Sequence, residues 1–285
     1  MKFIFHGGFH KTGTNNIQRA LLSQMDWLST KSTMVLPPVD AKRMGLNISS
    51  SVREDGLARL DEKRPNRLII SDEALFGNIG QVVFTGDLHR FPARPIDAYL
   101  TDFDTHPTDI LLCVRDYGAF FSAAYAGSIG PLAAKRFAMP DVAALKVMGN
   151  MPTWVRLITT VLKKFPNARV TLYRYEDHEA IQPKIFDYFL GTDVAEKFMS
   201  KTKDVIAQPV PETPTQPMMD RFFKHLNSVG LIDAYRDWQD TMRYDWIEGP
   251  EFSICTAQQA DHLTKTYNSD WEELRSYQNI TMLEP

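Results

Sequence analysis

The chain has 285 residues, 44% of them hydrophobic, which suits one large α/β domain or such a domain with a helical appendage. Lys and Arg number 32 against 35 Asp and Glu, and the formal net charge of −3 excludes a general attraction to nucleic acid or to an anionic membrane. The two cysteines, Cys113 and Cys255, are too few for a disulfide framework or a thiolate metal site.

Short apolar runs alternate with longer segments of helical spacing. The runs are apolar on both faces, which is typical of strands in a parallel sheet covered by helices. They predict strands at 3–5, 34–36, 68–70, 110–114 and 170–173. Between them, residues 17–28 and 154–165 carry apolar stripes of helical period. This alternation predicts a doubly wound α/β fold, with a mainly parallel sheet of about five strands flanked by helices.

A proline-rich segment, 207–217, interrupts this pattern, and neither a helix interior nor a central strand accommodates such a segment. We predict a linker or loop there. It separates an α/β core over 1–206 from a helical C-terminal part over 218–285. We expect that part to pack on the core, so that the chain forms a single domain overall.

The first residues are too short an apolar run for a signal peptide, and no stretch approaches the length of a membrane span. We therefore expect a cytoplasmic protein with no membrane span and no nucleic-acid partner. The seven histidines show no spacing typical of a zinc site, so we expect no metal.

A glycine-containing segment lies between the first predicted strand, which ends at His6, and the first predicted helix. Its residues are Gly7, Gly8, Phe9, His10, Lys11, Thr12, Gly13 and Thr14. Glycines in this place let several backbone N–H groups converge, and the helix N-terminus adds a partial positive charge. Lys11 supplies a full charge, and the threonines supply hydroxyl donors. The segment therefore predicts a loop that binds phosphate or sulfate; the alternative is a glycine turn with an exposed lysine.

The order of residues distinguishes this loop from that of nucleoside triphosphatases, which reads G-x-x-x-x-G-K-[ST], because Lys11 precedes Gly13. The loop resembles the 5′-phosphosulfate loop of sulfotransferases, and its His-Lys-Thr-Gly-Thr looks like the variant common among bacterial members. Asn15 departs from the family, which has a second threonine there. The resemblance implies 3′-phosphoadenosine-5′-phosphosulfate (PAPS) as donor and 3′-phosphoadenosine-5′-phosphate (PAP) as product. The donor-binding residues that it implies here are His10, Lys11, Thr12, Gly13, Thr14 and Asn15.

The fourth predicted strand leads into Arg115, and Ser122 follows in a predicted helix. The pair resembles the family's 3′-phosphate element, in which a guanidinium and a hydroxyl grip that phosphate from two sides. Ser122 lies one position earlier than the family places its serine, and one residue turns a side chain by ~100° around a helix. The alternative for Arg115 is an ion pair with Asp116 or Glu176.

Glu73 follows the third predicted strand, where many carbohydrate sulfotransferases have their general base. The resemblance implies that Glu73 takes the acceptor's proton, with Asp72, His89 and His106 as alternatives. A carboxylate at the carboxyl end of a strand points into the crevice where open α/β sheets bind ligands. The competing interpretation is helix capping, with Ser71 or Asp72 as N-cap and Glu73 in the first turn.

Two later segments, 170–177 and 262–277, also resemble the family, the second being a helix that packs back on the core. Together these resemblances imply a sulfotransferase in which Lys11 is catalytic, stabilising charge on the bridging oxygen, and in which no metal is required. The acceptor is a hydroxyl or amine of a carbohydrate or other small molecule, and segments 77–106 and 127–150 are expected to line its pocket. Two alternatives stay open: a P-loop-type kinase or nucleotide hydrolase, and a non-catalytic nucleotide-binding protein with a degenerate loop.

Overall fold

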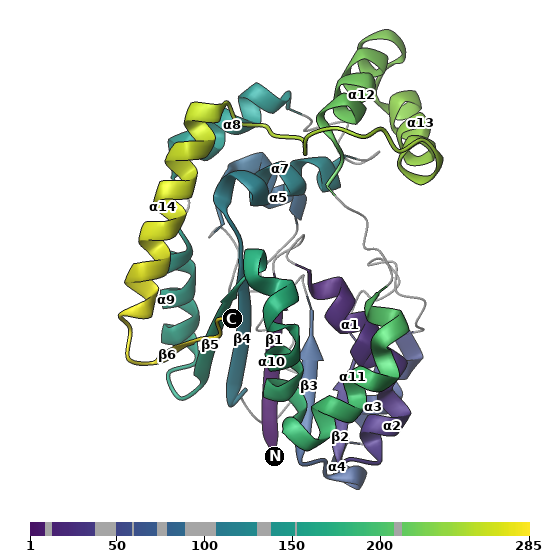
Figure 1. Cartoon of the computed structure of the whole chain (residues 1–285), viewed down its shortest axis with the longest axis vertical. Helices are drawn as coiled ribbons and strands as arrows, with labels where there is room; N and C mark the ends of the chain where they lie inside the picture. The colour runs from purple at the N-terminus through teal and green to yellow at the C-terminus, as the bar shows by residue number, and fades with distance from the viewer. Residues whose placement is uncertain are drawn as a thin grey trace.

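A six-stranded sheet forms the centre of the molecule (Figure 1). The computed structural model describes residues 1–8, 13–37, 50–58, 60–72, 79–88, 107–129, 138–151, 153–207 and 213–285. The strands are β1 (Lys2–Gly8), β2 (Thr33–Leu36), β3 (Arg67–Ser71), β4 (Asp109–Val114), β5 (Arg169–Arg174) and β6 (Ile280–Met282). All of them run parallel in the order β2-β3-β1-β4-β5-β6, which confirms the predicted α/β class.

The sheet has one strand more than the five apolar runs predicted, because β6 adds to its edge. Ile280 lies opposite Val170 of β5, and the N–H of Leu283 donates to the carbonyl of Leu172 at 2.8 Å. Ile280 is the buried residue of this three-residue strand. A short edge strand with one buried side chain leaves no apolar run for a sequence pattern to detect.

Helices cover both faces of the sheet (Figure 1). Strand residues such as Ile4 and Leu111 share a core with α1 (Thr14–Ser23), α2 (Met25–Ser29), α10 (His178–Leu190) and α11 (Thr192–Ile206). Their neighbours Phe5 and Leu112 point to the opposite face. There they share a second core with α5 (Ile79–Thr85), α7 (Tyr117–Ser128), α8 (Pro140–Asn150), α9 (Trp154–Lys164) and α14 (Ala257–Arg275). Burial on both faces explains why the strands read as continuous apolar runs.

The predicted helical stripe over 17–28 is divided in the structure. α1 ends at Ser23, whose hydroxyl donates to the carbonyl of Ala20 at 2.8 Å, and Gln24 separates it from α2. A serine hydroxyl that bonds the backbone of its own turn competes with helical hydrogen bonding, so the break falls beside it. Two further short helices, α3 (Ser50–Ala58) and α4 (Leu60–Lys63), lie beside the β2 edge.

The C-terminal part begins with α12 (Gln216–Val229) and α13 (Leu231–Tyr244), a helical hairpin that stands beside the sheet layers at the upper right of Figure 1. Pro217 occupies the first turn of α12, where proline is tolerated because its missing N–H has no intrahelical partner. The predicted linker 207–217 therefore overlaps the start of a helix.

α14 packs against α7 and α9, at the left of Figure 1. Asp270 of α14 is buried, and its carboxylate accepts hydrogen bonds from the hydroxyl of Tyr117 and, at 2.9 Å, from the backbone N–H of Trp154. One side chain thus joins three helices. In the described ranges no helix is both long enough and apolar enough to cross a membrane.

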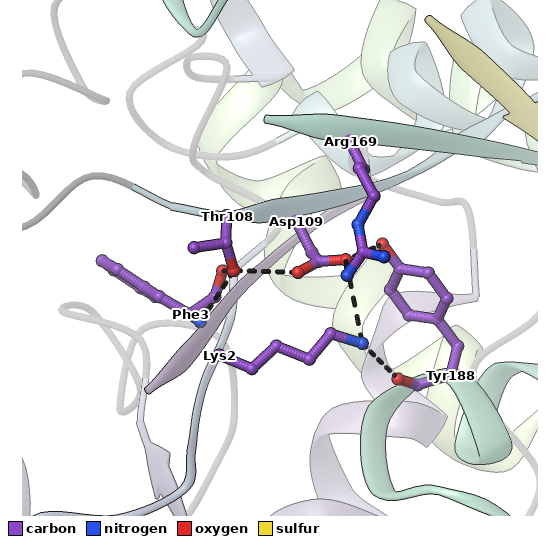
Figure 2. Close-up of polar contacts among 6 residues, drawn as sticks. All are labelled: Lys2, Phe3, Thr108, Asp109, Arg169 and Tyr188. Atoms are coloured by element: carbon purple, nitrogen blue, oxygen red, sulfur yellow. Dashed lines mark hydrogen bonds and ion pairs between the residues drawn. The ribbon is translucent and has the colours of Figure 1, made fainter. Parts of the chain in front are cut away.

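The amino end of the sheet is fixed by a cluster around Asp109 (Figure 2). The Asp109 side chain is only 1% exposed, and its Oδ1 lies 2.8 Å from Arg169 Nη2 and 3.7 Å from Lys2 Nζ. The Thr108 hydroxyl donates to Oδ2 at 2.8 Å, and the Tyr188 hydroxyl donates to Oδ1 at 3.3 Å. This buried carboxylate has two cations and a hydroxyl donor at Oδ1 and a hydroxyl donor at Oδ2, and a buried charge is tolerated when it is paired in this way.

Candidate functional site

The candidate site lies at the carboxyl ends of β3, β1 and β4, which are neighbours in the sheet. The chain order reverses beside β1, since β3 pairs on one side of it and β4 on the other. Open α/β sheets bind ligands in the crevice at such a reversal. β1 leads into the glycine loop, β3 into Asp72 and β4 into Arg115, so three predicted site elements meet at this edge.

β1 runs two residues further than predicted. Gly7 and Gly8 are extended and pair with Leu112 and Cys113 of β4, while the pairing with β3 ends at His6. The first two glycines of the loop therefore belong to the strand. The prediction placed them in the curled part because glycines between a strand and a helix allow the backbone to curl. Four loop residues, Phe9, His10, Lys11 and Thr12, lie outside the described residues.

Gly13 ends the loop and is the N-cap of α1, with a left-handed backbone of φ 74° and ψ 1°. A side chain here would be strained, because L-residues rarely adopt this conformation. A Cβ would also stand 3.3 Å from Tyr175 Cε2 and 3.4 Å from two ring carbons of His178. Gly13 thus allows the start of α1 to lie close to these two rings. Thr14 and Asn15 follow in the first turn of α1, and Thr14 is buried.

Arg115 follows β4 directly and is 5% exposed. Its guanidinium carbon lies 4.2 Å from the centre of the Tyr175 ring, within the range of cation–π attraction. The backbone carbonyl of Arg115 accepts a hydrogen bond from Trp154 Nε1 at 2.9 Å. Tyr175 follows β5 and opens the short 3₁₀ helix η3 (Tyr175–Asp177). The ends of β4 and β5 are therefore joined by this side-chain stack.

The two carboxylates considered as ion-pair partners of Arg115 are engaged by other groups. Asp116 caps α7 by accepting from the N–H of Ala119 at 3.0 Å, and it accepts from the Thr264 hydroxyl at 2.7 Å. Glu176 accepts from the N–H of Asp116 at 2.9 Å and from the Tyr267 hydroxyl at 2.8 Å. These contacts fasten the start of α7 to η3 and α14.

Ser122 is 2% exposed and lies inside α7. Its hydroxyl donates to the carbonyl of Gly118 at 2.6 Å and accepts from the N–H of Ile254 at 3.1 Å. A serine has one O–H to donate, and a phosphate accepts hydrogen bonds. Binding a phosphate would require this hydroxyl to release the Gly118 carbonyl. In the described structure Ser122 instead holds the segment before α14 against α7, and its role at the 3′-phosphate stays a prediction.

Asp72 follows β3 and is 1% exposed, and its N–H donates to the carbonyl of His6 at 3.0 Å. It is thus the described member of the group considered as general base, and it lies beside the start of the glycine loop. The other members, Glu73, His89 and His106, lie outside the described residues, so the capping interpretation of Glu73 is neither supported nor opposed.

A buried polar layer lies directly under this edge. Ser71 Oγ is 2.7 Å from His6 Nδ1, and the Tyr173 hydroxyl is 3.1 Å from His6 Nε2. Gln18 of α1 donates from Nε2 to the carbonyl of Ser71 at 3.2 Å. Burial, and to a smaller extent the neighbouring His178, lowers the pKa of His6 to about 3, so the imidazole is neutral.

Several buried polar atoms around α1 have no hydrogen-bond partner among the described residues. They are Asn15 Oδ1, Asn16 Oδ1, Gln18 Oε1 and both ring nitrogens of His178. Burial also lowers the pKa of His178, which favours its neutral form. Unpaired buried polar groups are few in natural proteins, and one ordinary reason for them is a bound molecule. Their concentration around the first two turns of α1 marks this edge as the candidate site.

Tyr175, His178 and His6 were not identified from the sequence as site residues. The first two follow the fifth predicted strand, so the rule that ligand-binding groups follow parallel strands could have found them. His6 directly follows the apolar run Phe3–Phe5 in β1, and a polar residue at this place in the strand was the available signal.

The segments expected to line the acceptor pocket are described in part, as α5 and α8. Phe84 at the end of α5 is 37% exposed, and Lys146 Nζ of α8 lies 4.4 Å from the centre of its ring. Among the described residues no group of three His, Cys, Asp or Glu side chains is placed to hold a metal ion. No family model, no curated protein and no solved structure matches the chain.

Proposed function

We propose that the chain is a sulfotransferase that moves a sulfuryl group from PAPS to a hydroxyl or amine of a carbohydrate or other small-molecule acceptor. One observation carries the proposal. The Tyr175 ring lies beside two predicted donor-binding residues. Its Cε2 would be 3.3 Å from a Cβ placed on Gly13, at the end of the predicted 5′-phosphosulfate loop, and its centre is 4.2 Å from the guanidinium carbon of Arg115, the predicted 3′-phosphate ligand. A nucleotide with phosphates at both ends of one ribose needs two anion-binding elements side by side.

In the proposed reaction the bond from sulfur to the 5′-phosphate oxygen breaks as a bond from sulfur to the acceptor forms. Lys11 and the N–H groups at the N-terminus of α1 stabilise the negative charge that builds on the departing oxygen. Glu73 or Asp72 takes the proton that leaves the acceptor. Arg115 holds the 3′-phosphate, with Ser122 as a second predicted contact. The proposal includes a cytoplasmic location and requires no metal.

The proposal is tested by calorimetry with PAP and 5′-AMP in the absence of magnesium. PAP should bind at least ~10-fold more tightly, because a charge-assisted hydrogen bond contributes about 1.5–3 kcal/mol. Arg115→Ala should remove most of this preference and leave the affinity for 5′-AMP nearly unchanged. Arg156→Ala, which removes an exposed arginine of α9, is the matched control and should keep the preference. Equal affinities, or binding that requires magnesium and ATP, would favour the kinase alternative.

A further inference from the structure

The buried imidazole of His6 connects the start of the glycine loop to the end of β3, where Ser71 is followed by Asp72. His6 is 0% exposed and immediately precedes Gly7, and in the sheet it lies opposite Ser71, the last residue of β3. Its Nδ1 is 2.7 Å from Ser71 Oγ, and its carbonyl accepts from the N–H of Asp72 at 3.0 Å. Both the backbone and the side chain of His6 therefore form hydrogen bonds with the residues at the end of β3.

A third hydrogen bond connects the end of β3 to helix α1. Gln18 of α1 donates to the carbonyl of Ser71 at 3.2 Å, and α1 begins at the other end of the glycine loop. Ser71 and Asp72 are thus connected both to His6, which precedes the glycine loop, and to α1, which follows the loop.

This polar layer is not expected to add stability over an apolar one. A buried polar group that replaces an apolar side chain must recover its lost hydration through hydrogen bonds, and paired networks often do no more than that. Polar groups retained under a candidate site therefore suggest a role in fixing geometry rather than in stabilising the fold.

We propose that His6 is a positioning residue: through Ser71 it fixes the end of β3, with the carboxylate of Asp72 that follows, relative to the start of the glycine loop. The geometric statement stands on the three contacts alone, and its consequence for turnover rests on the proposed function. Positioning matters there because a displacement of about 1 Å between reacting groups can lower a rate by about 10²-fold.

The imidazole forms a second hydrogen bond, and its removal supplies a matched control. Its Nε2 is 3.1 Å from the hydroxyl of Tyr173, a fully buried residue of β5. Ser71→Ala and Tyr173→Phe each remove one hydroxyl that is a hydrogen-bond partner of the His6 imidazole, so both should lower the unfolding temperature. Of these two hydrogen bonds, only the one to Ser71 involves the residue next to Asp72.

The experiment compares these two variants in the full chain with two measurements. Consumption of PAPS, followed as PAP release with water as acceptor, should fall at least ~10-fold in Ser71→Ala per folded molecule and stay within about twofold in Tyr173→Phe. Hydrogen exchange at the Asp72 amide, followed by NMR, should be faster in Ser71→Ala than in Tyr173→Phe at equal global stability. Ser71→Thr, which restores a hydroxyl, should recover both values.

The outcomes separate the two proposals. If the wild type neither binds PAP nor consumes PAPS, the proposed function fails, and Asp72 exchange alone decides the role of His6. If the Asp72 amide exchanges its hydrogen at the same rate in Ser71→Ala and in Tyr173→Phe, His6 supports the fold without fixing the position of Asp72, and the inference is overturned. Equal losses of PAPS consumption in both variants would overturn it as well.

Discussion

Acid should destabilise this protein through His6, and the structure sets the size of the effect. A buried ring with a folded-state pKa of about 3 binds no proton near neutrality, whereas in the unfolded chain a histidine titrates near a pKa of about 6.5. The folded pKa is the lower one, so this contribution to stability is complete above about pH 6.5 and is lost as the pH falls from there toward about 3. Each pH unit in that window is worth about 1.4 kcal/mol, which gives about 2 kcal/mol lost by about pH 5.

The measurement is urea unfolding of the wild type and of His6→Asn at about pH 7.5 and about pH 5, followed by tryptophan fluorescence. The wild type should lose about 2 kcal/mol more than the variant between these two conditions. His178 also faces His6 and has a pKa lowered by burial, but it is present in both proteins and contributes to both losses. His262→Asn, which removes an exposed ring of α14, should behave like the wild type.

Absolute stabilities do not enter this comparison, because only the difference between the two pH values is used. The variant can therefore be less stable throughout without affecting the result. If the wild type and His6→Asn lose the same free energy on acidification, the imidazole is not held neutral by burial, and the reasoning is refuted.

Three further predictions concern the site and the opposite end of the sheet. Lys11→Ala should lower PAPS turnover by about 10² or more while PAP binding, measured by calorimetry, weakens less; near-normal turnover would refute its role at the bridging oxygen. Glu73→Gln should lower turnover by roughly 10²–10⁴ if Glu73 is the base, and unchanged activity per folded molecule with reduced stability would establish capping instead. Asp109→Ala should cost about 2–3 kcal/mol in urea unfolding, because it removes the buried acceptor that Lys2 and the hydroxyls of Thr108 and Tyr188 share. Arg169→Ala, which removes the 75% exposed partner, should cost less than about 1 kcal/mol; similar losses in the two variants would contradict this assignment.

The sequence predicted the parts of the fold that residue patterns determine directly. The centres of β1 to β5 were found because both of their faces are buried, so each appears as an unbroken apolar run. β6 was missed because its existence depends on pairing with β5, a contact far away in the sequence. The break at Gln24 was missed because apolar spacing continues across it while a local hydrogen bond of Ser23 ends the helix.

The candidate site was predictable to a lesser degree. Gly13, Asp72 and Arg115 were found because each stands where a strand ends or a helix begins, and the structure places all three at one edge of the sheet. Tyr175 was missed because its importance comes from its contact with Arg115 and its position beside Gly13, and both residues are distant from it in the chain. The partners of Ser122 could not be foreseen for the same reason, since Ile254 arrives from the segment before α14.

The two ends of the sheet treat buried polar groups in opposite ways. At the amino end, both oxygens of Asp109 have partners, and the cluster holds β1, β4 and β5 together. At the carboxyl end, His178 and the first turn of α1 bury polar atoms that have no partner within the described chain. An unpaired buried polar group typically costs about 1–3 kcal/mol, so several at one edge are tolerated only if other parts of the fold are stable enough. The satisfied cluster and the two apolar cores supply that stability, which leaves the carboxyl end able to keep hydrogen-bonding groups for a bound molecule.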